Sequence, residues 1–322
     1  MNSLVLFSLL PVVLLIAAGF IAGRARWIRA EAVSDLSNLI FLLLTPALLF
    51  RTMSVVHVEQ LDFRPVAAYF MAVVILFTGI LLVQGFNRRG AVLALAGTFS
   101  NTVMIGIALI GLMYGPQGLV TLLTLVSVHS LVLLTSATLA LELAVVHEYK
   151  LNPDAAITDT KPARHPALIV LMAFKNALLH PVPLPIMVGL LFAQTGWVMP
   201  AVIDRPLELL ANAFGPLALV MVGVTLANTP LGKHWRQALG LAVVKNLLHP
   251  LLVFCLCKLL GVSGLPMVVM VVASALPIGA NVFLFSQRYK VAEELITAGV
   301  VMSTALAMLT LTLVLLLVGQ AG

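Results

Sequence analysis

Two asparagines stand in similar polar, helix-breaking segments within apolar stretches of the chain. Asn101 lies in residues 99–106 (FSNTVMIG), and Asn281 ends residues 276–281 (LPIGAN), 180 positions further on. A primary amide has two N–H donors and one acceptor, so it can hold a carboxylate without adding charge. Free backbone N–H groups and the positive end of a half-helix favour the same ligand. The pair therefore predicts a binding site for a small organic anion, although each asparagine could instead only cap its own broken helix.

Lys245 and His129 are the other polar side chains expected deep in the membrane. Lys245 follows Lys233 by 12 residues, which places it roughly 18 Å deep at 1.5 Å per helical residue. A charge there costs about 2.5–3.5 kcal/mol, so it should face protein or water. Lys245 could attract an anionic substrate, relay protons or act as a strut bonded to helix ends. His129 is a candidate proton relay or a neutral partner in an interhelical hydrogen bond.

Composition defines the elements that must position these residues. The chain of 322 residues is 61% hydrophobic and 9% charged, with a mean hydropathy of +1.13. A soluble protein has roughly 25% charged residues, so we predict an all-α membrane protein with about ten transmembrane helices. The expected spans are 4–23, 35–53, 65–86, 90–113, 119–146, 182–196, 206–228, 235–260, 265–287 and 292–318.

The basic residues predict the orientation in a plasma (inner) membrane. The first apolar run is followed by arginines, which indicates a retained helix rather than a cleaved signal peptide. With both termini outside, 13 of the 18 Lys and Arg residues fall in predicted inner segments, as the positive-inside rule expects. The net charge of +6 therefore reflects topology and does not indicate nucleic-acid binding. Membrane lipid is the expected surrounding of the protein. The composition indicates no cofactor, and the two cysteines are not arranged as ligands of a metal ion.

The two halves of the chain resemble each other weakly. Trp27 precedes Pro46 by 19 residues and Trp197 precedes Pro216 by the same distance, and in each half a polar break follows two spans later. Both prolines should kink their helices. Five spans per half is an odd number, so the second half enters the membrane from the opposite side, as an inverted repeat. We expect repeats over 1–146 and 182–322, joined by a cytoplasmic linker, 147–181, with a candidate interfacial helix near 167–179.

Several segments resemble the auxin efflux carrier family, whose bacterial members include malonate-type transporters. They are residues 46–51 (PALLFR), 100–110 (SNTVMIGIALI), 113–115 (MYG) and 275–281 (ALPIGAN). The resemblance implies a five-plus-five inverted repeat similar to the bile-acid sodium symporter fold. In that fold a scaffold bundle, often dimeric, supports a mobile bundle in which two broken helices cross.

The resemblance also assigns roles to residues of this chain. The crossover asparagines would be Asn101 and Asn281, and one crossover proline would be Pro277. Ser100 stands where the plant pattern has a proline, and Ala108 where another would follow Gly106. The first crossover would therefore depend on Ser100, Thr102 and Gly106, and Gly279 would belong to the second. Ser100, Thr102 and Gly279 are accordingly further candidate substrate ligands beside the asparagines.

These features favour a secondary transporter of small organic anions, such as mono- or dicarboxylates, that works by alternating access. Malonate as a substrate follows from the family resemblance only. No Asp or Glu lies at mid-depth in a predicted span, which favours uniport driven by membrane potential, with proton coupling through Lys245 or His129 as the alternative. A sodium site could still use backbone carbonyls and hydroxyls such as those of Ser274 or Thr102. A membrane sensor that binds a small ligand without transport is the second hypothesis, and the absence of catalytic motifs argues against an enzyme.

Overall fold

The computed structural model describes residues 2–56, 61–151, 182–229 and 234–318, and this part of the chain is helical apart from its turns and one isolated β-bridge. The predicted interfacial helix near 167–179 and most of the linker 147–181 lie outside the described residues. The elements are α1 (Asn2–Arg24), α2 (Ala32–Leu39), η1 (Ile40–Leu44), α3 (Thr45–Met53), α4 (Arg64–Gln84), α5 (Arg88–Thr98), η3 (Thr102–Ile107), α6 (Ala108–Leu151), α8 (Pro183–Gln194), α9 (Ala201–Asn228), α10 (Trp235–Val243), η5 (Val244–Leu248), α11 (His249–Leu259), α12 (Gly264–Ala275), α13 (Asn281–Tyr289) and α14 (Glu293–Val318).

Six helical stretches in the described part are long and apolar enough to cross a membrane. They are Ala32–Met53, Arg64–Gln84, Thr102–His129, Ala201–Asn228, Trp235–Leu259 and Glu293–Val318. Three shorter apolar helices accompany them: Leu10–Arg24, Pro183–Gln194 and Gly264–Ala275. An all-helical protein with several membrane spans is therefore confirmed, whereas the full set of ten spans stays a prediction.

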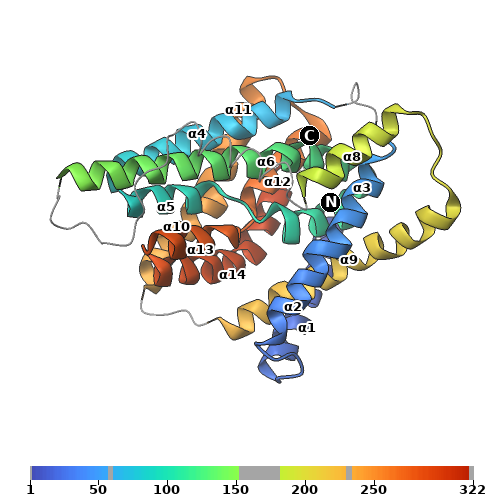
Figure 1. Ribbon diagram of the computed structural model, residues 1–322, viewed down its shortest axis with the longest axis horizontal. Helices are drawn as coiled ribbons and strands as arrows, with labels where there is room; N and C mark the ends of the chain where they lie inside the picture. The colour runs from blue at the N-terminus through green and yellow to red at the C-terminus, as the bar shows by residue number, and fades with distance from the viewer. Residues whose placement is uncertain (1, 57–60, 152–181, 230–233, 319–322) are drawn as a thin grey trace.

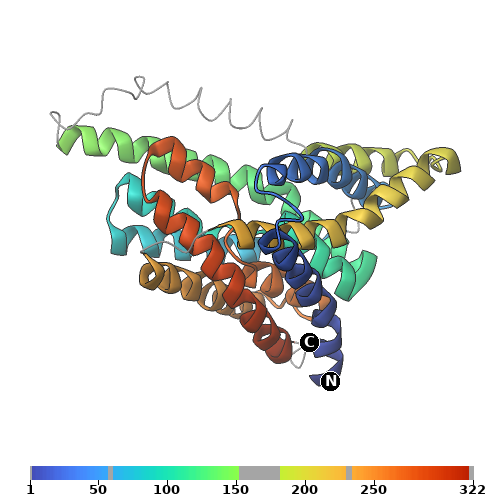
Figure 2. The same ribbon diagram turned by 90° about the horizontal axis from the view of Figure 1, so that it is seen from below.

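The helices form two groups (Figures 1 and 2). The small bundle consists of α1, α2, η1, α3, α8 and α9, and the large bundle contains α4–α6 and α10–α14 with η3 and η5. Within the small bundle α9 packs along α1 and α3, and within the large bundle α14 packs on α10 and α12. The two bundles meet mainly where α6 and η3 pack against α9 and where α14 packs against α1.

Small residues allow α1 and α9 to approach closely. A Cβ atom on Gly19 would overlap the backbone of Val220, and one on Gly223 would overlap the backbone of Ile16. Without a hydrophobic effect between helices in lipid, such close backbone packing supplies much of the association energy. The glycines therefore make the small bundle a tightly packed unit.

Two of the three π-helical segments in the described residues, η1 and η5, interrupt long helices, and each is followed by a proline. η1 precedes Thr45-Pro46, and η5 precedes His249-Pro250. A proline has no N–H and its ring displaces the carbonyl four residues earlier, so the preceding turn widens. The hydroxyl of Thr45 donates to Ile40 O at 2.8 Å, a carbonyl that also accepts from the backbone N–H of Thr45. The local structure at Pro46 is thus shared by Pro250, whereas Pro216 lies inside the continuous α9 helix.

Candidate functional site

The two predicted helix breaks lie against each other in the large bundle. One separates α5 from η3 at residues 99–101, and the other separates α12 from α13 at residues 276–280. Asn101 N donates to Pro277 O and Gly279 N donates to Phe99 O, each at 2.9 Å, with Ser100 and Ile278 paired as an antiparallel bridge. Backbone groups freed by a break must find partners inside a membrane. Here each break supplies partners for the other.

Two glycines permit this close approach. A Cβ atom on Gly279 would lie 2.6 Å from the ring of Phe99 and 3.3 Å from Ser100 O. A Cβ atom on Gly106 would lie 2.8 Å from a methyl carbon of Leu276. Larger residues at these positions would separate the paired segments, so both glycines are needed for packing at the crossing.

Asn101 and Asn281 stand at the start of the two half-helices that leave the breaks. Asn101 is the N-cap of η3, and its Oδ1 accepts from Met104 N at 3.3 Å. Asn281 is the first residue of α13, and within the described part of the chain no hydrogen bond reaches its amide. Both side chains are partly exposed. Two amides beside two helix N-termini, where partial positive charge gathers, form an arrangement suited to an anion.

Ser100, Thr102 and Gly279, predicted as further ligands, are buried. Ser100 is 1% exposed and its hydroxyl lies 3.0 Å from the hydroxyl of Tyr69, while Thr102 is 3% exposed. The geometry gives these residues a supporting position behind the asparagines. Tyr69 was not anticipated from the sequence, because a single tyrosine in an apolar span carries no positional signal.

Lys245 lies at the carboxyl end of α12. Its side chain is fully buried, and Nζ donates to Ser274 O and to Leu276 O, both at 2.6 Å. The last carbonyls of a helix have no intrahelical donors and carry partial negative charge, so an ammonium group stabilises them. These contacts are of the kind expected for a strut between helices, and a direct role of Lys245 towards a substrate stays a prediction.

The side chain of His129 is part of a buried aromatic cluster with Tyr69, Phe99 and His249. His129 Nε2 lies 3.1 Å from the hydroxyl of Tyr69, and its ring centroid lies 4.9 Å from that of Phe99. The His249 ring lies 5.2 Å from that of Tyr69. His129 Nδ1 and both ring nitrogens of His249 are buried without a hydrogen-bond partner among the described residues. The Tyr69 contact matches the interhelical hydrogen bond predicted as the alternative for His129.

Ser303 of α14 and Asn246 of η5 hold the second helix break, residues 276–280, in place. Ile278 N donates to the hydroxyl of Ser303 in α14 at 3.1 Å, and Asn246 Nδ2 in η5 donates to Ser303 O at 2.7 Å. Asn246 is the residue next to Lys245, whereas Ser303 lies in an apolar helix and gave no sequence signal. Without the hydroxyl of Ser303, the buried N–H of Ile278 would lose this hydrogen bond, which would destabilise the folded protein.

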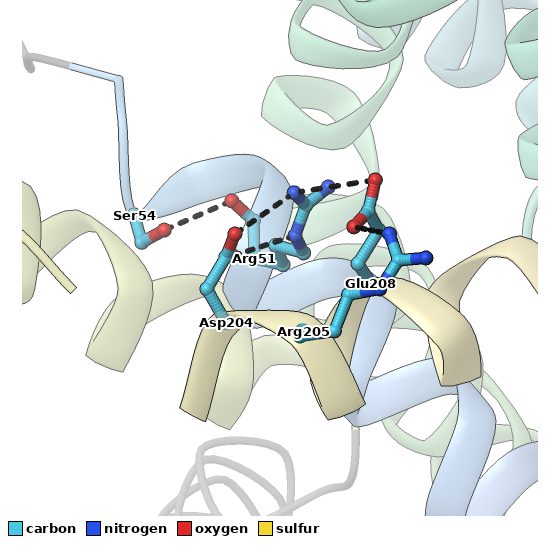
Figure 3. Close-up of polar contacts among 5 residues, drawn as sticks. All are labelled: Arg51, Ser54, Asp204, Arg205 and Glu208. Carbon is cyan, nitrogen blue, oxygen red and sulfur yellow. Dashed lines mark hydrogen bonds and ion pairs between the residues drawn. The ribbon is translucent and has the colours of Figure 1, made fainter. Parts of the chain in front are cut away.

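A group of charges joins α3 and α9 of the small bundle (Figure 3). Arg51 at the end of α3 donates from Nε to Asp204 Oδ1 at 2.8 Å and from a terminal nitrogen to Asp204 Oδ2 at 3.2 Å. Glu208 lies 3.9 Å from Arg51 and pairs with Arg205 at 2.7 Å. The structure thus pairs Arg51 with two residues of α9. This cluster braces α3 against α9.

Two surface cavities lie away from the asparagines. One of about 580 Å³ is lined by charged and polar residues that include Arg89, His234 and Glu293, and one of about 410 Å³ is an apolar groove between α3, α8 and α9. Neither is lined by Asn101 or Asn281. In the residues that the structure describes, no three His, Cys, Asp or Glu side chains gather as ligands for a metal ion. We therefore identify the candidate site from the facing helix breaks rather than from a cavity.

Comparison with known proteins gives one family over nearly the whole chain. The family model described as "Membrane transport protein" matches residues 4–315. The chain is 27% identical to the "Putative malonate transporter" of Rhizobium meliloti (strain 1021) over 96% of its own length and 94% of that protein. It is 24% identical to auxin efflux carrier component 8 of Arabidopsis thaliana, over 44% of this chain and 40% of that protein. It is also 26% identical to the lysosomal cholesterol signaling protein of Mus musculus, over 90% of this chain and 35% of that protein.

Proposed function

The chain belongs to the auxin efflux carrier family of membrane transport proteins, and we propose that it is a secondary transporter of small organic anions such as mono- and dicarboxylates. Malonate is the first substrate to test, because the name of the Rhizobium meliloti relative carries it. The observation that supports an anionic substrate is the pairing of the two helix breaks, which brings together the helix starts that carry Asn101 and Asn281.

The two amides supply complementary donors. The Oδ1 atom of Asn101 accepts from its own helix, so its Nδ2 group keeps two N–H donors for a ligand. The amide of Asn281 is the first side chain of α13 and lies beside the positive end of that half-helix. A carboxylate bound here would meet hydrogen-bond donors and partial positive charge without a fixed cation that would hinder its release.

We propose alternating access as the mechanism, with the large bundle moving against the small bundle. Each half of the chain contributes helices to both bundles, as a five-plus-five inverted repeat would. Close glycine packing makes the small bundle a suitable scaffold, and the proposed substrate site lies in the large bundle, next to the contact between η3 and α9. A relative movement at this contact would expose the asparagines to one side of the membrane at a time.

The proposed energy source for transport rests on the lack of Asp and Glu at mid-depth in the predicted spans. We propose uniport driven by the membrane potential, which favours the exit of anions from a negative interior by about 2.3 kcal/mol per charge at 100 mV. Proton coupling through His129 or Lys245 is the alternative. The protein would lie in the plasma (inner) membrane with both termini outside, surrounded by lipid, and the family resemblance favours a homodimer.

The test is uptake of labelled malonate and a panel of small carboxylates by proteoliposomes with imposed potential and pH gradients. We expect saturable flux that responds to the potential alone, whereas a response to the pH gradient would favour proton coupling. Asn281→Ala should abolish most of the flux. The control is Asn228→Ala, because among the described residues the amide of Asn228 bonds only to Val224 O of its own helix.

The outcome that contradicts the proposal is the absence of flux for every carboxylate in folded protein. Ligand binding without flux would instead favour the membrane sensor, and a different substrate panel that gives flux would correct the substrate class.

A further inference from the structure

The carboxyl end of α12 is held by a cation from another helix. Ser274 O and Leu276 O converge on Lys245 Nζ at 2.6 Å each, and the ammonium is fully buried. Lys245 comes from η5, 29 and 31 residues before its two acceptors. In the described part of the chain, no carboxylate pairs with Lys245, so its recorded partners are backbone carbonyls alone.

Carbonyl oxygens at the end of a half-helix are ligands of a recognisable kind. In membrane carriers with broken helices, unwound backbone carbonyls and half-helix carboxyl ends coordinate Na⁺ or protons. A primary ammonium and Na⁺ carry the same charge and both bind oxygen. The carboxyl end of α12 therefore has donor chemistry for a monovalent cation, and the Lys245 ammonium occupies it.

The two half-helices that end at the breaks are stabilised differently. In the last turn of α5 the hydroxyl of Thr98 donates to Ala94 O at 2.8 Å and to Leu95 O at 3.2 Å, both within its own helix, and Leu95 O also accepts from Phe99 N. The end of α12 instead receives the Nζ group of Lys245 from a different helix segment, which brings a full positive charge when it is protonated. The end of α12 thus has a donor from outside its own helix, whereas the hydroxyl at the end of α5 belongs to that helix.

We propose that the Lys245 ammonium is a resident cation that fills a monovalent-cation site at the carboxyl end of α12. The protein then needs no metal ion at this position, and removal of the side chain opens a site for a small alkylammonium ion or Na⁺. The binding part of this inference rests on the geometry alone. Its consequence, transport independent of sodium, rests on the proposed transport function.

Thermal unfolding in lipid nanodiscs tests the inference without any substrate. The variants are Lys245→Ala, Lys245→Met, which keeps an unbranched chain but no charge, and Lys258→Ala, which removes an exposed lysine from α11. Tm is measured in methylammonium, Na⁺ or K⁺ chloride, with choline chloride maintaining the ionic strength.

We expect the Tm of wild type to be the same in all four salts. The Tm of Lys258→Ala should likewise not depend on the salt. Lys245→Ala should have a lower Tm in choline and should recover by roughly 3 °C at a methylammonium or Na⁺ concentration ten times its Kd. Lys245→Met should remain low in every salt, because its side chain occupies the space that the ion would need.

Two results would overturn the inference. One is a Lys245→Ala protein whose Tm responds to none of the cations. The other is a wild-type protein that Na⁺ itself stabilises relative to choline, and this result is decisive even if Lys245→Ala fails to fold. Because Tm reports binding rather than flux, a failure of the proposed transport function would leave both readouts interpretable.

Discussion

Tyr69→Phe removes one hydroxyl from the interior of the large bundle and leaves the ring in place. Tyr69 is fully buried, and its hydroxyl lies 3.0 Å from Ser100 Oγ and 3.1 Å from His129 Nε2. Ser100 belongs to the segment that pairs with Pro277–Gly279. The substitution therefore tests whether a buried hydrogen-bond network supports the crossing.

The expected loss of stability follows from the groups left behind. Without the hydroxyl, Ser100 and His129 each lose a partner in a buried site, and an unpaired buried polar group costs about 1–3 kcal/mol. His129 Nδ1 is already unpartnered among the described residues, so its ring would retain no hydrogen bond there. We expect a total loss of about 2–4 kcal/mol, which for a chain of this length corresponds to a fall in Tm of roughly 3–6 °C.

The assay is thermal unfolding of purified protein in nanodiscs. The matched control is Tyr114→Phe, because Tyr114 is only partly buried and no hydrogen bond of its hydroxyl is recorded within the described residues. Its Tm should stay within about 2 °C of wild type. Ser100→Ala in the Tyr69→Phe background should cost less than Ser100→Ala alone, because the two residues share one interaction. A Tyr69→Phe protein with the Tm of wild type would refute the network.

The remaining predictions concern close packing and surface charge. Gly279→Ala should reduce malonate flux at least tenfold, because its Cβ would collide with the Phe99 ring, whereas Gly240→Ala should not, because nothing lies within 4 Å of a Cβ there. Gly223→Leu should destabilise the protein by about 1–3 kcal/mol or more, because the side chain would collide with α1 at the α1–α9 contact. Gly79→Leu, whose Cβ meets open space, should be nearly neutral. Equal Tm values for the two variants would contradict this packing. Arg51→Gln should cost less than about 1 kcal/mol, and less still at high salt, because the side chains of Arg51 and Asp204 are 34% and 38% exposed. A large loss at 0.5 M salt would show that this cluster does more than brace two helices.

The helix breaks were predictable from sequence because polar and helix-breaking residues stand out in an apolar background. Asn101 and Asn281 were found in this way, and the structure joins their segments through Asn101, Pro277 and Gly279. The buried position of Lys245 could also be predicted, because its depth in a helix follows from residue counting. The sequence could not decide whether Lys245 attracts a substrate, relays protons or acts as a strut. That depends on its contacts with the end of α12, which lies 30 residues further along the chain, so only the fold could indicate the role.

The supporting residues could not be predicted, for a physical reason. Tyr69 and Ser303 lie in apolar helices with no local pattern, and their partners, Ser100 and Ile278, are 31 and 25 residues away. Similarly, the pairing of Arg51 with Asp204 connects residues 153 apart. Contacts of this kind are set by helix packing, whereas sequence periodicity reports only which helices exist.

The most direct test of the account is equilibrium binding of labelled malonate to wild type, Asn101→Ala, Asn281→Ala and Asn228→Ala in nanodiscs. Loss of a hydrogen bond to a charged ligand costs about 1.5–3 kcal/mol, or roughly 10- to 150-fold in Kd. We predict saturable binding to wild type, a weakening of that size in Asn101→Ala and in Asn281→Ala, and no change in Asn228→Ala. Malonate affinity unchanged by either substitution at the crossing would contradict the assignment of the substrate site to the two asparagines.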